Sequence, residues 1–146
     1  MTTVNVYLTF NGNCEEAFNF YRSVFGGEFS YIGKFGDMPP QEGMASVSET
    51  EKDRIMHASL PISKETVLMG SDSSEAQDES TIIGNNFSIS INTDSKDEAD
   101  RLFNELSAGG QETMAMGNTF WGSYFGMLTD KFGINWMVGF DENENQ

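Results

Sequence analysis

Hydrophobic and polar residues follow two alternating patterns along this chain, and both patterns occur twice. In residues 4–10 the apolar side chains occupy every second position, which is the period of a half-buried strand. A helix is predicted next, because Asn13 is a good N-cap, Glu16 follows three residues later, and Gly26-Gly27 would stop it. One face of this helix is apolar and consists of Ala17, Phe18, Tyr21, Val24 and Phe25. Such a stripe is expected to cover a sheet.

Three more strands complete the first predicted module. Their sequences are EFSYIGKF, RIMHASLPI and TVLMGSD, at residues 28–35, 54–62 and 66–72. An acidic loop at 36–53 contains Pro39-Pro40, and a second turn is expected around residues 63–65. The pattern therefore predicts a βαβββ module over residues 1–72.

The same pattern restarts after a polar segment at 73–86, which we interpret as a linker. A strand is predicted over 87–93, followed by a helix from the N-cap Ser95 to Gly109-Gly110. The helix positions repeat those of the first module at an offset of 82, and the strand positions repeat at an offset of 83. This match predicts an internal duplication.

The end of the chain completes the second module. Short strands are expected near 111–116, over 120–130 and over 133–140, and TDKFG forms the turn of the last hairpin. The predicted fold is therefore α+β, with two βαβββ modules. The second module covers 87–140, and the polar residues 141–146 are expected to be a frayed tail.

Charge and composition exclude several classes of partner. The chain has 8 basic and 23 acidic residues, a formal net charge of -15, and no two adjacent basic residues. This balance disfavours nucleic acid and anionic lipid. Gly, Asn and Asp interrupt every apolar run before the roughly 20 residues that a membrane helix needs. One cysteine, Cys14, cannot form an internal disulfide, and polar residues follow Met1, so we expect a cytoplasmic protein.

Three stretches carry a resemblance to a known family: YLTFNGNCEEAFNFYRSVFGGE, IMHASLPI with VLMGSD, and FWGSYFGMLTDKFGINWMVGF. They resemble the vicinal oxygen chelate superfamily of glyoxalases, bleomycin-resistance proteins and dioxygenases. Within it they resemble the PhnB-like branch, often labelled 3-demethylubiquinone-9 3-methyltransferase. The resemblance implies that the modules form curved mixed sheets, each of which is half of a cup. It also implies that paired modules enclose a ligand pocket and that the protein is a homodimer. Whether modules pair within one chain or between protomers stays open.

The chemistry of this superfamily can be checked at matched positions. Its metal enzymes place His or Glu ligands on the first and last strands of the modules. The matching positions here are Val6, Met69, Phe87 and Trp136. None can bind a divalent cation, and one histidine cannot supply the usual ligand set. We therefore expect no metal and no cofactor. The methyltransferase label also lacks support, since the turn FNGNCEE has one glycine instead of a glycine-rich loop.

His57 is the remaining candidate acid or base, because histidine ordinarily exchanges protons near neutral pH. It could equally be a sheet-surface histidine that is hydrogen-bonded to a neighbour. Ser71 and Asp72 could orient it or contact a ligand, or simply end a strand. Cys14 could be activated by the helix start or be buried on the apolar stripe.

An apolar pocket is the leading hypothesis for the function. The chain contains nine methionines and eighteen aromatic residues, which can fill two cores but can also line a cup. The predicted ligand-binding residues are Met69, Ser71, Asp72, Trp121, Tyr124, Phe125 and Trp136. Both tryptophans could instead pack beneath the sheet. We expect metal-independent binding of a small apolar or aromatic molecule. The alternatives are an enzyme that uses His57 (a lyase, dioxygenase or methyltransferase) and an interaction module with a filled cup.

Overall fold

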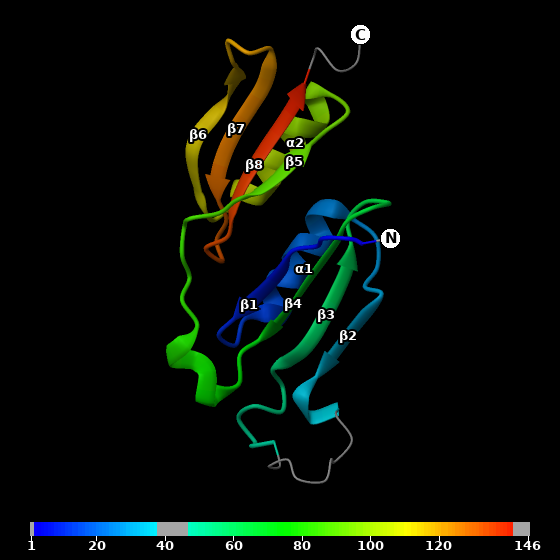
Figure 1. Ribbon diagram of the computed structural model, residues 1–146, viewed down its shortest axis with the longest axis vertical. Coiled ribbons are helices and arrows are strands. Elements are labelled where there is room, and N and C mark those ends of the chain that lie inside the picture. The colour runs from blue at the N-terminus through cyan, green and yellow to red at the C-terminus, as the bar shows by residue number, and fades with distance from the viewer. Residues whose placement is uncertain (1, 38–46, 142–146) are drawn as a thin grey trace. The chain divides into compact units, whose positions relative to one another are not determined.

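The computed structural model describes residues 2–37 and 47–141 of the chain (Figure 1). The chain divides into two compact units, Met1–Ile82 and Ile83–Gln146. Each unit contains a four-stranded mixed sheet and one long helix, so the predicted α+β fold with two βαβββ modules is confirmed.

The first unit begins with β1 and α1 and continues with three strands. Its elements are β1 (Tyr7–Phe10), α1 (Cys14–Phe25), β2 (Tyr31–Lys34), the short 3-10 helix η1 (Phe35–Asp37), β3 (Ile55–Pro61), β4 (Val67–Asp72) and the 3-10 helix η2 (Glu75–Ser80). The sheet order is β1-β4-β3-β2, with β1 parallel to β4 and the other pairs antiparallel. Part of the predicted acidic loop, 38–46, lies outside the described residues.

The second unit repeats this arrangement. Its elements are β5 (Ile89–Asn92), α2 (Lys96–Ser107), β6 (Gln111–Asn118), β7 (Ser123–Thr129) and β8 (Asn135–Asp141). The order β5-β8-β7-β6 again combines one parallel pair with two antiparallel pairs. The segment predicted as a frayed tail begins with Asp141, which belongs to β8, and its other residues lie outside the described part of the chain.

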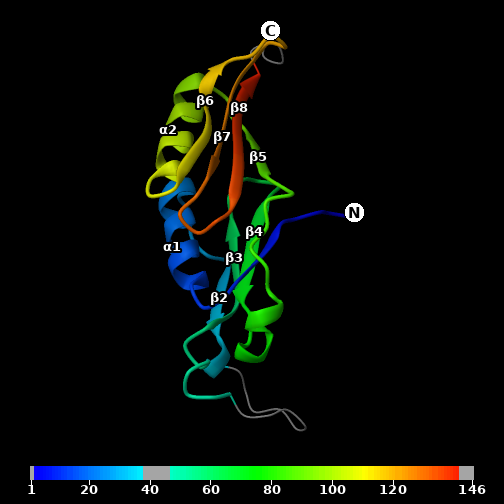
Figure 2. The ribbon, with the colours of Figure 1, turned by 90° about the vertical axis from the view of Figure 1, so that its left-hand side faces the viewer.

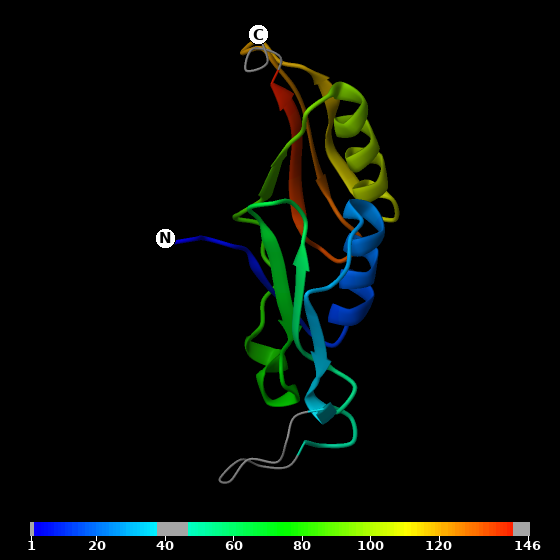
Figure 3. The ribbon, with the colours of Figure 1, turned by 90° about the vertical axis from the view of Figure 1, so that its right-hand side faces the viewer.

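Each helix covers one side of its own sheet, as Figures 2 and 3 show for both units. Strand residues on that side are buried, because successive side chains of a strand point to opposite faces. The largest buried side chains are Phe10, Phe18, Tyr21, Ile55, Leu60 and Leu68 in the first unit and Leu106, Leu128, Trp136 and Val138 in the second. We call the other side of each sheet its open face.

The two helices begin in different ways. The Ser95 side chain accepts a hydrogen bond of 3.1 Å from the backbone N–H of Glu98, so the predicted cap of α2 is confirmed. The N-cap position of α1 is Asn13, as predicted, but the Asn13 side chain makes no capping hydrogen bond. A carboxylate that is distant in sequence takes this role: Asp72 Oδ1 accepts from the N–H groups of Gly12 at 2.8 Å and Cys14 at 2.9 Å.

The predicted TDKFG turn joins β7 and β8. Asp130 Oδ1 accepts from the backbone N–H groups of Phe132 and Ile134, and Gly133 has a φ of 91°, which favours glycine. In the part of the chain that the structure describes, neither α1 nor α2 is long and apolar enough to cross a membrane.

Candidate functional site on the open sheet faces

The open faces of the two sheets can be matched residue by residue. The offset of 83 between the first strands matches Tyr7 with Ser90, and their strand partners are Met69 and Met137. On the next strands, Ser59 of β3 pairs with Met69, and Met127 of β7 pairs with Met137, so Ser59 matches Met127. The open faces therefore correspond at six positions: Tyr7, Thr9, His57, Ser59, Met69 and Ser71 match Ser90, Asn92, Phe125, Met127, Met137 and Gly139.

The open face of the first sheet carries an aromatic group around His57. The Tyr7 hydroxyl lies 3.2 Å from His57 Nδ1, and the two rings stack with centroids 5.6 Å apart. The Tyr31 ring lies 5.9 Å from His57 and above Gly33, where an added Cβ would meet its hydroxyl. His57 is thus a sheet-surface histidine with a hydrogen-bonding neighbour. This geometry also holds its imidazole in one orientation, as an acid or base requires.

The open face of the second sheet carries a pocket of about 290 Å³. Trp121, which is 55% exposed, and Phe125 form its aromatic walls, with ring centroids 6.2 Å apart. Asp141 supplies the only carboxylate among the described lining residues. Small and polar residues complete the lining, namely Ser90, Ile91, Asn92, Ser123 and Gly139.

The pocket has room because Gly139 has no side chain. Its φ is not positive, so its backbone conformation does not demand glycine. A Cβ at this position would lie 3.3 Å from the Tyr124 carbonyl oxygen and 3.5 Å from Phe125 Cδ2. A larger side chain would therefore extend across the face toward Phe125 and occupy the pocket.

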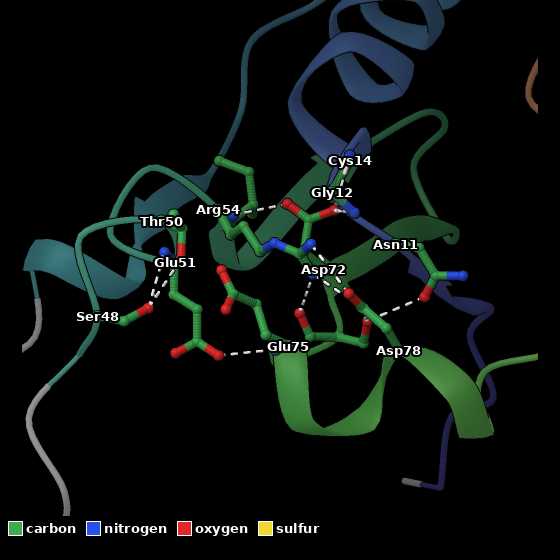
Figure 4. Close-up of polar contacts among 12 residues, drawn as sticks. Asn11, Gly12, Cys14, Ser48, Thr50, Glu51, Arg54, Asp72, Glu75 and Asp78 are labelled. Carbon is green, nitrogen blue, oxygen red and sulfur yellow. Dashed lines mark hydrogen bonds and ion pairs between the residues drawn. The ribbon is translucent and has the colours of Figure 1, made fainter.

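Asp72, a predicted ligand-binding residue, lies on the helix-covered side of its sheet and is buried. Besides its two bonds at the start of α1, its Oδ2 accepts from the Ile55 N–H at 2.8 Å. Nearby, Arg54 forms a two-pronged ion pair with Asp78 of η2, at 2.8 and 3.1 Å (Figure 4). The hydrogen bond from Arg54 is the main reason that the pKa of Asp78 lies below its ordinary value. Asp72 therefore connects β3, β4 and the helix start, whereas its neighbour Ser71 shares the face of His57.

Two predicted pocket aromatics of the second unit also face the helix. Trp136 is fully buried, and its indole N–H donates to Asp130 Oδ2 at 2.8 Å. The Tyr124 hydroxyl donates to Asp100 of α2 at 2.6 Å, and this hydrogen bond is the main reason that the Tyr124 pKa is raised. Of the predicted residues, the structure therefore brings Trp121 with Phe125 and His57 with Met69 and Ser71 to open faces.

Cys14 is fully buried. Burial is the main cause that raises the pKa of its thiol, and the charges of Asp72 and Glu15 add to the effect. The alternative of a packing residue is therefore confirmed for Cys14, and an activated nucleophile is not.

The side chains do not fit the metal centre of the superfamily's enzymes. In the described ranges, no three His, Cys, Asp or Glu side chains are placed to hold an ion. At the six matched positions the open faces instead present hydroxyl, amide, thioether and aromatic groups, with His57 as the single imidazole, and Asp141 of β8 adds one carboxylate at the pocket. Hydroxyl, amide, thioether and aromatic groups are poor ligands for the divalent cations of such sites, and His57 and Asp141 belong to different sheets.

Sequence reasoning missed several residues of the open faces, among them Tyr7, Tyr31, Ser90 and Gly139. The sequence contains a signal for Tyr7 and Ser90. Side chains alternate between the two faces of a strand, so Tyr7 lies on the other face from Leu8. The offset of 83 between the modules then matches Tyr7 with Ser90. The same period places Met137, rather than Trp136, on the open face of β8.

Comparison with known proteins supports these assignments of fold. The profile of the Glyoxalase/Bleomycin resistance protein/Dioxygenase superfamily matches residues 3–138. Protein YjdN of Escherichia coli (strain K12) is 33% identical over 137 residues, which are 90% of each chain. The crystal structure of protein PA1353 from Pseudomonas aeruginosa is similar with a TM-score of 0.79 and 41% identity, over 97% of this chain and 98% of that one.

A PhnB protein from Bacillus cereus, which carries the name of a 3-demethylubiquinone-9 3-methyltransferase, has a similar fold. Its TM-score is 0.69 at 24% identity, over 95% of this chain and 99% of that one. At this identity the likeness concerns the fold.

Proposed function

Because the chain belongs to the Glyoxalase/Bleomycin resistance protein/Dioxygenase superfamily, we propose that it binds a small apolar or aromatic molecule without a metal ion. The binding site is the pocket on the open face of the second sheet, with Trp121 and Phe125 as its walls. The sequence predicts a binding cup between the two modules. We propose instead that the open face of the second module forms the site by itself.

The pocket opened by Gly139 is the observation that carries this proposal. Most ligand sites are concave and largely apolar, with a few polar groups that fix the orientation of the ligand. Trp121 and Phe125 supply the apolar area, and Ser90, Asn92 and Asp141 supply hydrogen-bonding groups. Trp136 and Tyr124 are not part of the proposed site, because both bond to partners on the helix-covered side.

A thermal-shift screen of hydrophobic antibiotics, quinones, aldehyde adducts and divalent metals tests the proposal. A ligand that binds only the folded chain at about one hundred times its Kd should raise the Tm by roughly 5–10 °C. The variant Gly139→Val should lose this shift, because its side chain enters the pocket. Gly117→Val is the matched control, since a Cβ at Gly117 meets nothing within 4 Å. Hits that keep their shift in Gly139→Val would contradict the proposed location.

Metal independence has its own test. Protein purified without chelator should contain no stoichiometric metal, and calorimetric titration with Ni, Zn, Mn or Fe should detect no tight site. One tightly bound cation per chain would refute this part of the proposal.

A second candidate function is catalysis with His57 as acid or base. The 3.2 Å contact with the Tyr7 hydroxyl and the stacked ring favour it, because both restrain the imidazole. For an identified substrate, His57→Ala should then abolish turnover while binding persists, and Tyr7→Phe should lower kcat more than it changes KM. If His57→Ala changes affinity only modestly and no turnover is found, the binding function stands alone.

We further propose a homodimer, as the family resemblance implies. Sedimentation velocity should give twice the 16.2 kDa mass of one chain. A monomer at micromolar concentration would contradict it. The cytoplasmic location stays a prediction from the sequence.

A further inference from the structure

The pocket of the second sheet is lined by Ser90 and Phe125, which match Tyr7 and His57 of the first sheet. Tyr7 and Ser90 are matched positions on the edge strands β1 and β5. In the first sheet the Tyr7 ring reaches across β4 and stacks on His57 with an interplanar angle of 21°. On β4, which lies between the strands of these two residues, Met69 pairs with Tyr7, and the small residue Ser71 is the next residue on this face. The first unit therefore shows how a ring sits over this sheet when the chain itself supplies it.

In the second sheet each of these three positions has changed in a way that vacates the ring's place. Ser90 replaces the tyrosine, Gly139 replaces Ser71, and Phe125 replaces His57 as the surface on which a ring can stack. All three replacements line the pocket. Trp121 contributes a second aromatic wall, at 62° to Phe125.

We infer that this pocket accepts one planar aromatic ring, stacked on Phe125 at the position that Tyr7 occupies in the first unit. The inference rests on the proposed function and deepens it, since it names the shape and chemistry of the ligand. Offset stacking between aromatic rings adds attraction beyond the burial of apolar area. A planar ring should therefore bind better than a saturated ring of the same skeleton.

The polar lining assigns a substituent to the ring. Asp141 is the one charged group that lines the pocket, and no Lys or Arg is among the described lining residues. Residues 83–146 contain ten acidic and three basic side chains, so the surrounding potential is negative. The ligand is thus a ring that carries an O–H or N–H donor, such as a phenol or an aromatic amine, and not an aromatic acid.

Titration calorimetry of the full-length protein with 2-naphthol and decahydro-2-naphthol tests the planar ring. The two probes share the skeleton and the hydroxyl, but only the first is planar. We expect 2-naphthol to bind about threefold to tenfold more tightly. Equal affinity for both probes would overturn the aromatic inference but leave the proposed binding of an apolar molecule intact. Absence of binding by both probes, together with no hit in the thermal-shift screen, would remove the proposed function as well.

The position of the ring is tested by introducing a tyrosine at position 90, which matches Tyr7 of the first sheet. Ser90→Tyr should place a ring over Phe125 and weaken 2-naphthol binding more than about tenfold, since the ligand must displace it. Asn104→Tyr adds the same side chain to the exposed surface of α2 and should leave binding unchanged. Ser90→Tyr protein that keeps its Tm and its affinity for 2-naphthol would show that the ring binds elsewhere.

The hydrogen-bond donor on the ligand is tested with the variant Asp141→Asn and with the probes 2-methoxynaphthalene and 2-naphthoate. Wild-type protein should bind 2-naphthol most tightly and 2-naphthoate least tightly. Asp141→Asn should reduce this preference, whereas Asp97→Asn, which removes a charge from the first turn of α2, should not. Tighter binding of 2-naphthoate than of 2-naphthol by wild-type protein would overturn the assignment of a donor-bearing ring.

Discussion

The open faces of the two sheets differ at three matched positions around the pocket, which hold Tyr7, His57 and Ser71 in the first unit and Ser90, Phe125 and Gly139 in the second. The backbone registers around them are the same. In the first unit the rings of Tyr7 and His57 stack on this face, and in the second unit the smaller residues Ser90 and Gly139 line a pocket beside Phe125. A repeated βαβββ module can therefore present a ring-covered face in one unit and, as we propose, a binding face in the other, without a change of fold.

A similar contrast exists at the helix starts. In the first unit Asp72, fifty-eight residues away from Cys14, accepts the first amide of α1. In the second unit the local residue Ser95 caps α2. The first unit therefore relies on a contact between distant segments where the second relies on its local sequence.

The largest expected effect tests which side of β7 and β8 each aromatic residue faces. Trp136→Ala should lower the free energy of unfolding by about 3–5 kcal/mol, because it leaves a cavity in the core and removes a hydrogen bond to Asp130. Phe125→Ala on the open face should cost about 1 kcal/mol. Urea denaturation of both variants measures this difference. A larger loss for Phe125→Ala would reverse the assignment of faces on which the comparison of units depends.

The distant cap of α1 should have the next largest effect. Asp72→Ala removes an acceptor from three backbone N–H groups, two of them in buried bonds, and should cost about 2–4 kcal/mol in urea denaturation. Hydrogen exchange should then speed up at the start of α1. A loss below about 1 kcal/mol would mean that other groups satisfy these amides.

A smaller effect separates the two capping residues that the sequence suggests. Ser95→Ala should cost about 1 kcal/mol, because its hydroxyl accepts the Glu98 N–H. Asn13→Ala should cost clearly less, since its side chain makes no such bond. Equal losses in thermal denaturation would indicate that both helices begin with the same local cap.

The smallest effect concerns two ion pairs at low pH. The pKa of Asp78 is lowered mainly by its hydrogen bond from Arg54, and that of Glu98 mainly by its hydrogen bond from Arg101. Because each pKa is lower in the folded chain, the stabilisation is present above the unfolded value of about 4 and is lost as the pH falls through the folded value.

Asp78→Asn should therefore lower the Tm at pH 7, and its difference from wild type should shrink below about pH 4. Glu98→Gln should show the same direction with a smaller change, because the Arg101–Glu98 pair is more exposed than the Arg54–Asp78 pair. A Tm difference for Asp78→Asn that stays constant down to pH 2 would contradict this explanation.

The order of elements, both modules and the final hairpin could be predicted from the sequence, because apolar periodicity and glycine stops are local signals. The faces were harder to assign, since a shift of one residue moves a side chain to the other face. Trp136 was predicted for the pocket because it matches a ligand position of the superfamily's metal enzymes, whereas its strand neighbour Met137 lies on the open face. Asp72 could not be recognised as a cap, because its partners Gly12 and Cys14 lie at the opposite end of the first module.

The pocket itself depends on the absence of large side chains at two positions of the open face. A glycine at 139 and a serine at 90 have no distinctive sequence signal, and their effect emerges only when the matched tyrosine of the first unit is seen in place. Trp121 and Phe125 could be predicted because they lie in a dense aromatic stretch, and they remain the walls of the proposed site.

Fluorine NMR of protein labelled with 5-fluorotryptophan tests the central claim most directly, because the two tryptophans lie on opposite sides of the second sheet. Trp121 lines the pocket and Trp136 is fully buried. Trp121→Phe assigns the two resonances. Titration with 2-naphthol should shift the Trp121 resonance in a saturable manner and leave that of Trp136 nearly unchanged. A saturable shift of Trp136 alone, or no shift of Trp121 at saturating ligand, would contradict a binding site on this open face.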